Sequence, residues 1–96
     1  MVIWSFPAKE DLKIIHDYIA KDSKVYAKKV VERIVETTEK LNEFPKIGRM
    51  VPEIDSHNVR ELLIYSYRII YEIAQNRIEI LTIVHSKRDF SSGILK

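Results

Sequence analysis

The side chains in this sequence that could act on an anion are arginines, and most of them lie in its second half. Five of the six arginines follow residue 44, whereas seven of the ten lysines precede it. A guanidinium holds phosphate or carboxylate through two parallel hydrogen bonds, whereas lysine is a hydrated point charge suited to exposed helix faces. We therefore expect the second half to bind an anionic group, unless its arginines pair with carboxylates on neighbouring strands.

Three of these arginines are expected to share one face of a β-sheet. Arg60 and Arg68 each alternate with apolar residues in a strand-like segment, and Arg88 follows the last such segment. Because neighbouring strands lie about 4.8 Å apart, one sheet face could gather the three guanidinium groups as a phosphate site. The alternative is that Arg68 pairs with Glu61 or Glu72 across strands.

His85 and Tyr67 could take part in the same site. Histidine titrates near neutral pH, so His85 could act as a general acid or base. Tyr67 adjoins Arg68, and a phenol beside a guanidinium could stack on a base or bind a phosphate. Each also has a structural interpretation, because His85 could be an ordinary strand-end residue and Tyr67 could be part of the packing. Histidine pairs at ligand spacing are missing and the carboxylates are scattered, so we expect no metal site.

The composition excludes several classes of function. The 96 residues are expected to form one domain, residues 1–96. Gly48 and Gly93 are the only glycines, which excludes a Walker loop, a dinucleotide fingerprint and a Gly-x-Ser-x-Gly elbow. The sequence has no cysteine, so thiolate chemistry is excluded, and we expect no cofactor. A net charge of +2 is too small to indicate nucleic-acid binding by itself. The first residues carry neither a basic leader nor a long apolar stretch, so we expect a cytoplasmic protein without membrane association.

Helical periodicity dominates the first half. After a short strand at 2–5, apolar residues at spacings of four and three predict a helix over 7–20, and a second such run predicts a helix over 24–43. The short linker predicts an antiparallel helical hairpin. Phe44 and Pro45 end the second helix, and 46–56 is expected to be a loop. Trp4, Phe44, Tyr18 and Tyr26 are expected to pack rather than to bind.

The period changes to two beyond the loop. Segments 59–65, 68–74 and 78–85 are rich in Ile, Val, Leu and Tyr and are separated by short polar breaks. Such tight connections require an antiparallel meander, because parallel crossovers need a dozen or more residues. The expected fold is α+β, with a short N-terminal strand and a two-helix hairpin packed on an antiparallel sheet in the order β-α-α-β-β-β.

Short motifs along almost the whole chain combine into one pattern. They are Trp4 with Pro7-Ala8-x-x-Asp11-Leu12, Leu41-x-x-Phe44-Pro45-x-x-Gly48-Arg49, Val59-Arg60-Glu61-Leu62, Tyr67-Arg68-Ile69-Ile70-Tyr71 and Ile83-Val84-His85-Ser86-Lys87-Arg88-Asp89. In this order and spacing they resemble the RelE/ParE toxins of bacterial type II toxin–antitoxin operons. The resemblance implies a helical hairpin against an antiparallel sheet, in agreement with the fold expected above.

The resemblance implies two mechanisms. RelE-like members cut mRNA on the ribosome without a metal, and there Arg68 and Arg88 match catalytic arginines. His85 would be the general acid or base, with Glu53 as a candidate partner. The lysine pair of RelE is replaced here by Arg60 next to a carboxylate, and its C-terminal tyrosine is replaced by an isoleucine. These departures make the chain more similar to ParE-like members, which inhibit DNA gyrase.

Three hypotheses follow from this resemblance. The first is a ParE-like toxin that inhibits growth by acting on an essential target such as DNA gyrase. The second is a ribosome-dependent endoribonuclease that acts on mRNA, and the third is a degenerate member that only binds an antitoxin. In each, the partner is a cognate antitoxin in a hetero-oligomer, and such pairs serve plasmid stabilization. We expect Arg49, Arg60, Tyr67 and Lys87 to contact the target or nucleic acid.

Overall fold

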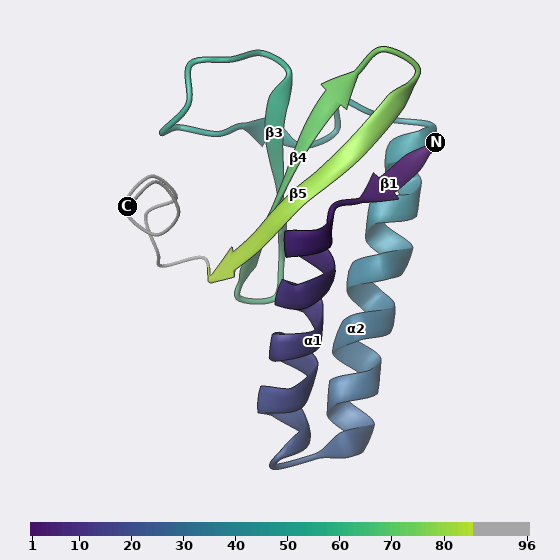
Figure 1. Ribbon diagram of the computed structural model, residues 1–96, viewed down its shortest axis with the longest axis vertical. Coiled ribbons are helices and arrows are strands. Elements are labelled where there is room, and N and C mark those ends of the chain that lie inside the picture. Colours follow the sequence, from purple (N-terminus) through teal and green to yellow (C-terminus); the bar gives the residue numbers. More distant parts are fainter. Residues whose placement is uncertain (86–96) are drawn as a thin grey trace.

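The computed structural model describes residues 1–85, which form two helices beside a five-stranded sheet (Figure 1). The elements in chain order are β1 (Val2–Trp4), α1 (Phe6–Ala20), α2 (Lys24–Glu39), the 3-10 turn η1 (Lys40–Asn42), β2 (Arg49–Met50), β3 (Val59–Ile64), β4 (Tyr67–Ala74) and β5 (Arg77–His85). This is the α+β fold expected from the sequence, with β2 as an additional short strand in the expected loop.

Serine side chains begin both helices. The Ser5 hydroxyl accepts a hydrogen bond from Ala8 N at 3.2 Å, and the Ser23 hydroxyl accepts one from Tyr26 N at 3.1 Å. Each cap satisfies an amide that has no partner inside its helix. Helix α2 ends at Glu39, four residues before the predicted end, because the chain tightens into η1 ahead of Phe44 and Pro45.

The sheet is mixed, with the strand order β1-β5-β4-β3-β2. Strands β3, β4 and β5 form the predicted antiparallel meander, and β2 extends it at one edge. At the other edge β1 pairs in parallel with β5, with Val2 opposite Ile78 and Trp4 opposite Ile80. The sequence predicts antiparallel pairing for the three strands of the meander and leaves the direction of β1 open. The three residues of β1 carry no signal of strand direction, which depends on where the helical hairpin returns the chain.

A β-bulge in β5 determines which of its residues face the helices. The pairing shifts between Ile70 and Tyr71, which lie opposite Thr82 and Ile80, so that Leu81 is the extra residue. As a result, Ile83 follows Ile80 on the side of the helices, where regular alternation would place Thr82. Strict alternation along the predicted strand could not indicate this change of face.

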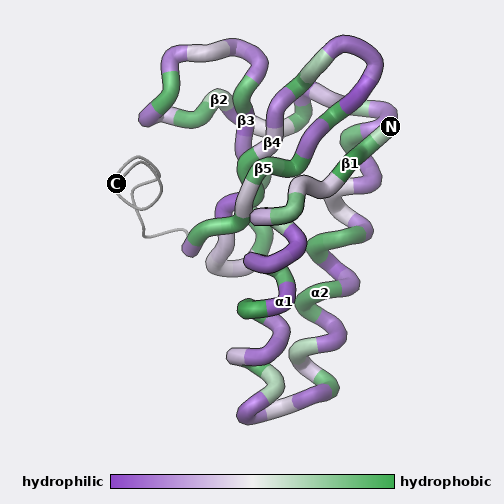
Figure 2. Tube along the Cα trace, viewed as in Figure 1, coloured by the Kyte–Doolittle hydropathy of each residue, from purple (hydrophilic) through white to green (hydrophobic). Residues whose placement is uncertain are grey.

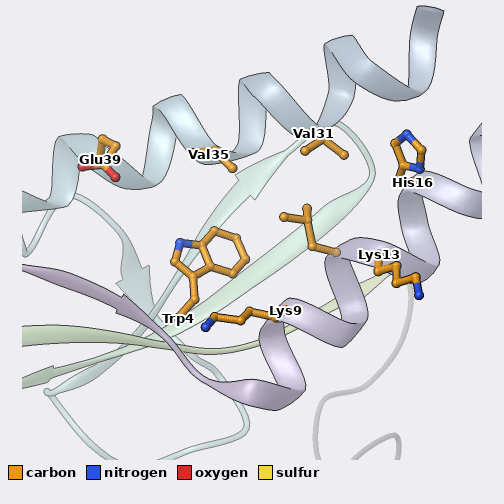
Figure 3. A pocket seen from close by; sticks show the side chains of 8 residues that line it. Trp4, Lys9, Lys13, His16, Val31, Val35 and Glu39 are labelled. Atoms are coloured by element: carbon orange, nitrogen blue, oxygen red, sulfur yellow. The ribbon is translucent and has the colours of Figure 1, made fainter. Parts of the chain in front are cut away.

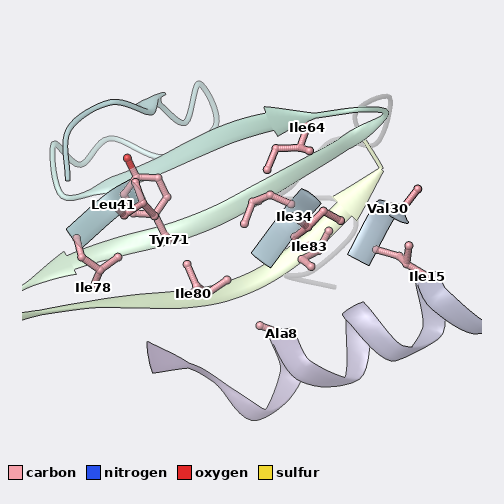
Figure 4. Close-up of a cluster of buried hydrophobic side chains, with 11 residues drawn as sticks. Ala8, Ile15, Val30, Ile34, Leu41, Ile64, Tyr71, Ile78, Ile80 and Ile83 are labelled. Carbon is pink, nitrogen blue, oxygen red and sulfur yellow. The ribbon is translucent and has the colours of Figure 1, made fainter. Parts of the chain in front are cut away.

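The main core lies between the helical hairpin and the sheet (Figure 4). Ile34 and Leu41, from the α2–η1 segment, are fully buried against Ile69 and Ile80 of the sheet. The alternating hydropathy along the helices and strands is visible in Figure 2. Ile69, Tyr71 and Ile73 lie on the face of β4 that packs on the helices.

The opposite face of the sheet carries a second, smaller cluster. Val51 and Ile54, from the segment between β2 and β3, pack on Val59, Ile70 and Leu81. This part of the sheet is therefore covered by a loop, and Arg68 does not lie on an open sheet face. A loop of polar and apolar residues without periodicity gives no sign in the sequence that it folds back over a strand.

A close contact joins the segment between η1 and β2 to the sheet at Gly48. The fully buried Tyr71 donates from its hydroxyl to Pro45 O at 2.7 Å and accepts from Gly48 N at 2.9 Å. A Cβ on Gly48 would lie 2.6 Å from both Glu61 O and the Tyr71 hydroxyl, so only glycine fits. Burial raises the pKa of Tyr71, while the Gly48 amide and the Arg60 charge act in the opposite direction.

Candidate functional site

Arg68 lies at the centre of a buried group of charges. Its guanidinium donates to both carboxylate oxygens of Glu53, from Nη1 at 2.9 Å and from Nη2 at 2.7 Å. It also donates to Glu61 Oε1, from Nε at 2.8 Å, and Nη2 lies 2.7 Å from the same oxygen. Arg68 is only 5% exposed. The guanidinium is therefore occupied by two carboxylates and is nearly removed from solvent.

Arg49 completes this group, which we call the Arg68 network: Arg49, Glu53, Glu61 and Arg68. The exposed Arg49 donates from Nε to Glu61 Oε2, so the buried Glu61 carboxylate lies between two guanidinium groups. Two positive and two negative charges balance within the network. The pKa of Arg68 is raised well above its ordinary value, mainly by the hydrogen bond to Glu53, although burial acts in the opposite direction.

The Arg68 network decides between the two interpretations of Arg68, a phosphate site or a pair with a carboxylate on a neighbouring strand. Arg68 pairs with a carboxylate on the neighbouring strand, as one interpretation of the sequence held, and that carboxylate is Glu61. The second partner, Glu53, comes from the segment between β2 and β3, 15 residues earlier. The sequence offers Glu53 only as a candidate partner of His85, because a loop residue cannot be placed without its tertiary contacts.

Arg60 does not join Arg68. The register places Arg60 opposite Tyr71 and Leu63 opposite Arg68, so the two arginines lie on opposite faces of β3 and β4. The Arg60 guanidinium donates to backbone carbonyls, including His57 O at 3.1 Å and Gly48 O at 3.0 Å. The predicted gathering of Arg60 with Arg68 was wrong, because a two-residue hairpin turn, not strand composition, determines which residues lie opposite one another.

His85 and Tyr67 lie on the face away from Arg68. Tyr67 is opposite His85, whereas Arg68 is opposite Val84. The Tyr67 and His85 rings meet edge to face with centroids 6.0 Å apart. Burial raises the pKa of Tyr67, with smaller contributions from nearby tyrosines. Arg68 and His85 therefore do not converge on one point, and Lys87 and Arg88 lie outside the described residues.

A groove lies between α1, α2 and Trp4 of β1 (Figure 3). We call it the helix groove; its volume is about 530 Å³. Its lining residues are Trp4, Lys9, Leu12, Lys13, His16, Val31, Val35 and Glu39. The centre is apolar and Lys9 and Lys13 supply positive charge. Trp4, predicted to pack, contacts the core and also lines this groove.

A second groove lies where the β3–β4 turn meets both helices. We call it the tyrosine groove, with a volume of about 620 Å³. Its lining residues are Ile14, Ile15, Tyr18, Ile19, Tyr26, Val30, Tyr65, Ser66, Tyr67 and His85. Tyr18 is 70% exposed and Tyr26 50% exposed, so the prediction that these two are packing residues was wrong. Phe44, also predicted to pack, is 57% exposed.

Within residues 1–85 no helix is long and apolar enough to cross a membrane. Over the same residues, His, Asp and Glu side chains do not gather in groups of three that could hold a metal ion.

The chain is similar to known proteins over most of its length. Residues 2–90 match the family described as "ParE toxin of type II toxin-antitoxin system, parDE". "Toxin RelE2" of Caulobacter vibrioides is 32% identical over 88 residues, which are 91% of this chain and 96% of that protein.

Solved structures share the fold. One is the chromosomal ParDE TA system from P. aeruginosa, with a TM-score of 0.74, 26% identity and coverage of 90% of this chain and 95% of that chain. Another is the YoeB dimer from Staphylococcus aureus, with a TM-score of 0.59, 20% identity and coverage of 84% and 90%. At this identity the second likeness concerns the fold alone.

Proposed function

We propose that this chain, which belongs to the ParE toxin family of type II toxin–antitoxin systems, arrests growth by binding and inhibiting an essential protein, DNA gyrase, without cutting RNA. The toxin assignment follows from the family. The choice of a binding mechanism follows from the side chains that would have to cut RNA.

The state of Arg68 is the observation that carries this choice. A metal-independent ribonuclease needs cationic donors directed at the phosphate, where negative charge develops in the transition state. Here the Arg68 guanidinium is 5% exposed and its charge is balanced by Glu53 and Glu61. His85, the candidate general acid or base, lies on the other face of the sheet. This arrangement supports a structural role for Arg68 and a toxin that acts by docking.

An antitoxin is the second part of the proposal. Solved structures with this fold include the ParDE TA system from P. aeruginosa and the YoeB–YefM complex from Staphylococcus aureus. The helix groove is a suitable surface, because it has an apolar centre with Lys9 and Lys13 on its α1 side, while Glu39 lies on its α2 side. Such a groove fits an amphipathic helix with acidic residues along one side.

One observation supports the alternative that the toxin is a ribonuclease. Glu53 is in direct contact with Arg68, so a carboxylate and a guanidinium do lie together. Displacement of the loop that carries Glu53 would be required before Arg68 could reach a phosphate. The experiment for the first hypothesis also tests this one.

Expression of the wild-type chain without antitoxin tests the proposal. We expect growth arrest, full-length mRNA, and loss of DNA supercoiling by purified gyrase when the purified toxin is added. Co-expression of the cognate antitoxin should restore growth. Rapid mRNA cleavage at the onset of arrest would instead establish the ribonuclease, and unimpaired growth would favour a member that only binds its antitoxin.

A further inference from the structure

The tyrosine groove presents an unusual concentration of exposed aromatic and aliphatic side chains. Tyr18, Tyr26 and Tyr65 are at least half exposed, and Ile14 beside them is exposed as well. Contiguous apolar surface of this kind marks interaction sites on soluble proteins. Tyrosine is also enriched among the residues that dominate binding energy at protein interfaces, because its rigid ring combines apolar area with a polar tip.

The backbone at Tyr65 is a second and independent observation. Tyr65 has φ of 54°, in the left-handed region that disfavours bulky side chains. It occupies the turn between Ile64 and Tyr67, where glycine would relieve the strain. The ring of Tyr65 meets that of Tyr26 edge to face, with centroids 6.5 Å apart. Tyr65 therefore combines a strained backbone with an exposed ring, and strained backbones of this kind cluster at functional sites.

The charges around the groove indicate the chemistry of its occupant. A smaller hollow adjoins it, because Tyr65 lines both, and Arg33 lies in that hollow. Lys21 Nζ lies 6.0 Å from the centroid of the Tyr18 ring. Among the described residues that line the two hollows, none is acidic. The surface is therefore complementary to a segment that carries carboxylates.

The side chains that line the tyrosine groove favour a protein over a nucleic acid as its occupant. Ile15, Ile19 and Val30 contribute aliphatic side chains to the groove. Binding of a nucleic acid depends on several cations that contact successive phosphates. An aliphatic surface with cations only at its margin instead matches apolar anchors of a protein.

We propose that the tyrosine groove is the surface with which this toxin holds its protein target, and that it takes a segment with an apolar or aromatic anchor flanked by carboxylates. The inference rests on the proposed function and deepens it. The helix groove, which shares no lining residue with the tyrosine groove, remains for the antitoxin.

Tyr65→Gly tests the inference, because it removes the ring and relieves the strain at once. We expect a melting temperature equal to or above that of the wild type, an intact complex with the cognate antitoxin, and loss of growth arrest. With purified gyrase, we expect at least tenfold more toxin for half-inhibition of supercoiling. Tyr18→Ala leaves the backbone unchanged at an exposed position and should weaken inhibition in the same way.

Asn76→Gly is the matched control. Asn76 is the other residue outside glycine with positive φ among residues 1–85, at 65°, and it lies in the β4–β5 turn. Glycine suits the same left-handed backbone there, and growth arrest should persist. Charge is tested in parallel: Arg33→Glu should weaken inhibition at least tenfold, whereas Arg77→Glu, beside Asn76, should not.

The outcomes separate the two proposals. If the wild type arrests growth with intact mRNA and Tyr65→Gly arrests it equally, the groove inference is overturned and the proposed function stands. Loss of antitoxin binding in Tyr65→Gly, or a changed oligomeric state in sedimentation, would overturn it in favour of an antitoxin or a second copy as the occupant. Arrest by mRNA cleavage, or no arrest by the wild type, would overturn both proposals.

Discussion

The Arg68 guanidinium lies between Glu53 and Glu61, which reach it from a loop and from the neighbouring strand. Burial changes what such a cation contributes. An exposed arginine could attract an anion from solution, whereas this one holds the β2–β3 loop on the sheet, because Glu53 would otherwise lie there without a counter-charge. At the scale of single residues, the guanidinium of Arg68 suggested an anion-binding site, whereas its burial between two carboxylates supports a structural role.

Replacement of Arg68 by alanine should therefore destabilise the fold. We expect a loss of about 3–5 kcal/mol in the free energy of unfolding, because Glu53 loses its guanidinium partner and the buried Glu61 keeps only the exposed Arg49. Urea unfolding followed by circular dichroism measures it. Arg77→Ala, at an exposed strand end, serves as the control and should change stability by less than about 0.5 kcal/mol. A loss below about 1 kcal/mol for Arg68→Ala would contradict the structural role.

At the scale of elements, one carboxylate attaches helix α1 to the irregular part of β5. Asp11 Oδ2 accepts hydrogen bonds from the Thr82 hydroxyl and from Ile83 N, the latter at 3.0 Å. Both donors lie directly after Leu81, the extra residue of the bulge. The bulge disrupts the ladder and the helix supplies the missing acceptor, so the position of α1 and the change of face in β5 depend on each other.

Asp11→Ala should loosen this junction. We expect a loss of about 1–3 kcal/mol in the free energy of unfolding, because the Ile83 amide is left without its acceptor. Hydrogen exchange by NMR should show faster exchange of the Ile83 amide in the variant. Asp17→Ala is the control on the same helix: Asp17 is exposed, contacts His16, and should leave both quantities nearly unchanged. Unchanged Ile83 exchange in Asp11→Ala would contradict the assigned role.

At the scale of the whole molecule, the helical hairpin has two grooves of different character. The helix groove is apolar with Lys9 and Lys13 beside it, and the tyrosine groove carries exposed rings. Helical periodicity explains the separation, because residues of one groove and those of the other project from α2 at nearly opposite angles. A toxin with two such surfaces could be neutralised through one while acting through the other.

Val35→Asp should separate neutralisation from toxicity. Val35 lines the helix groove, so a carboxylate there places an unpaired charge against an apolar partner. We expect growth arrest to persist and co-expressed antitoxin to fail to relieve it, with at least tenfold weaker binding by calorimetry. Glu36→Ala, on the exposed side of α2, should remain neutralised. Normal neutralisation of Val35→Asp would place the antitoxin elsewhere.

The sequence by itself determined the elements and their layers. Periods of 3.6 and 2 predicted both helices and the strands of the meander within a few residues, and the short breaks predicted their antiparallel pairing. Ser5 and Ser23 contribute to that accuracy, because caps act over three residues and depend on nothing distant. The motifs of the toxin family are also a property of the sequence, so the family could be assigned without the structure.

Only the tertiary structure decided what the candidate site residues contact. The bulge at Leu81, the parallel pairing of β1, the loop that brings Glu53 to Arg68 and the opposite faces of Arg60 and Arg68 all depend on contacts between distant segments. The exposure of Tyr18 and Tyr26 is of the same kind, since helical spacing places them at the margin of an apolar stripe and cannot say whether a neighbour covers them. Local periodicity determines which residues form an element, whereas burial and charge pairing depend on what the rest of the chain packs against it.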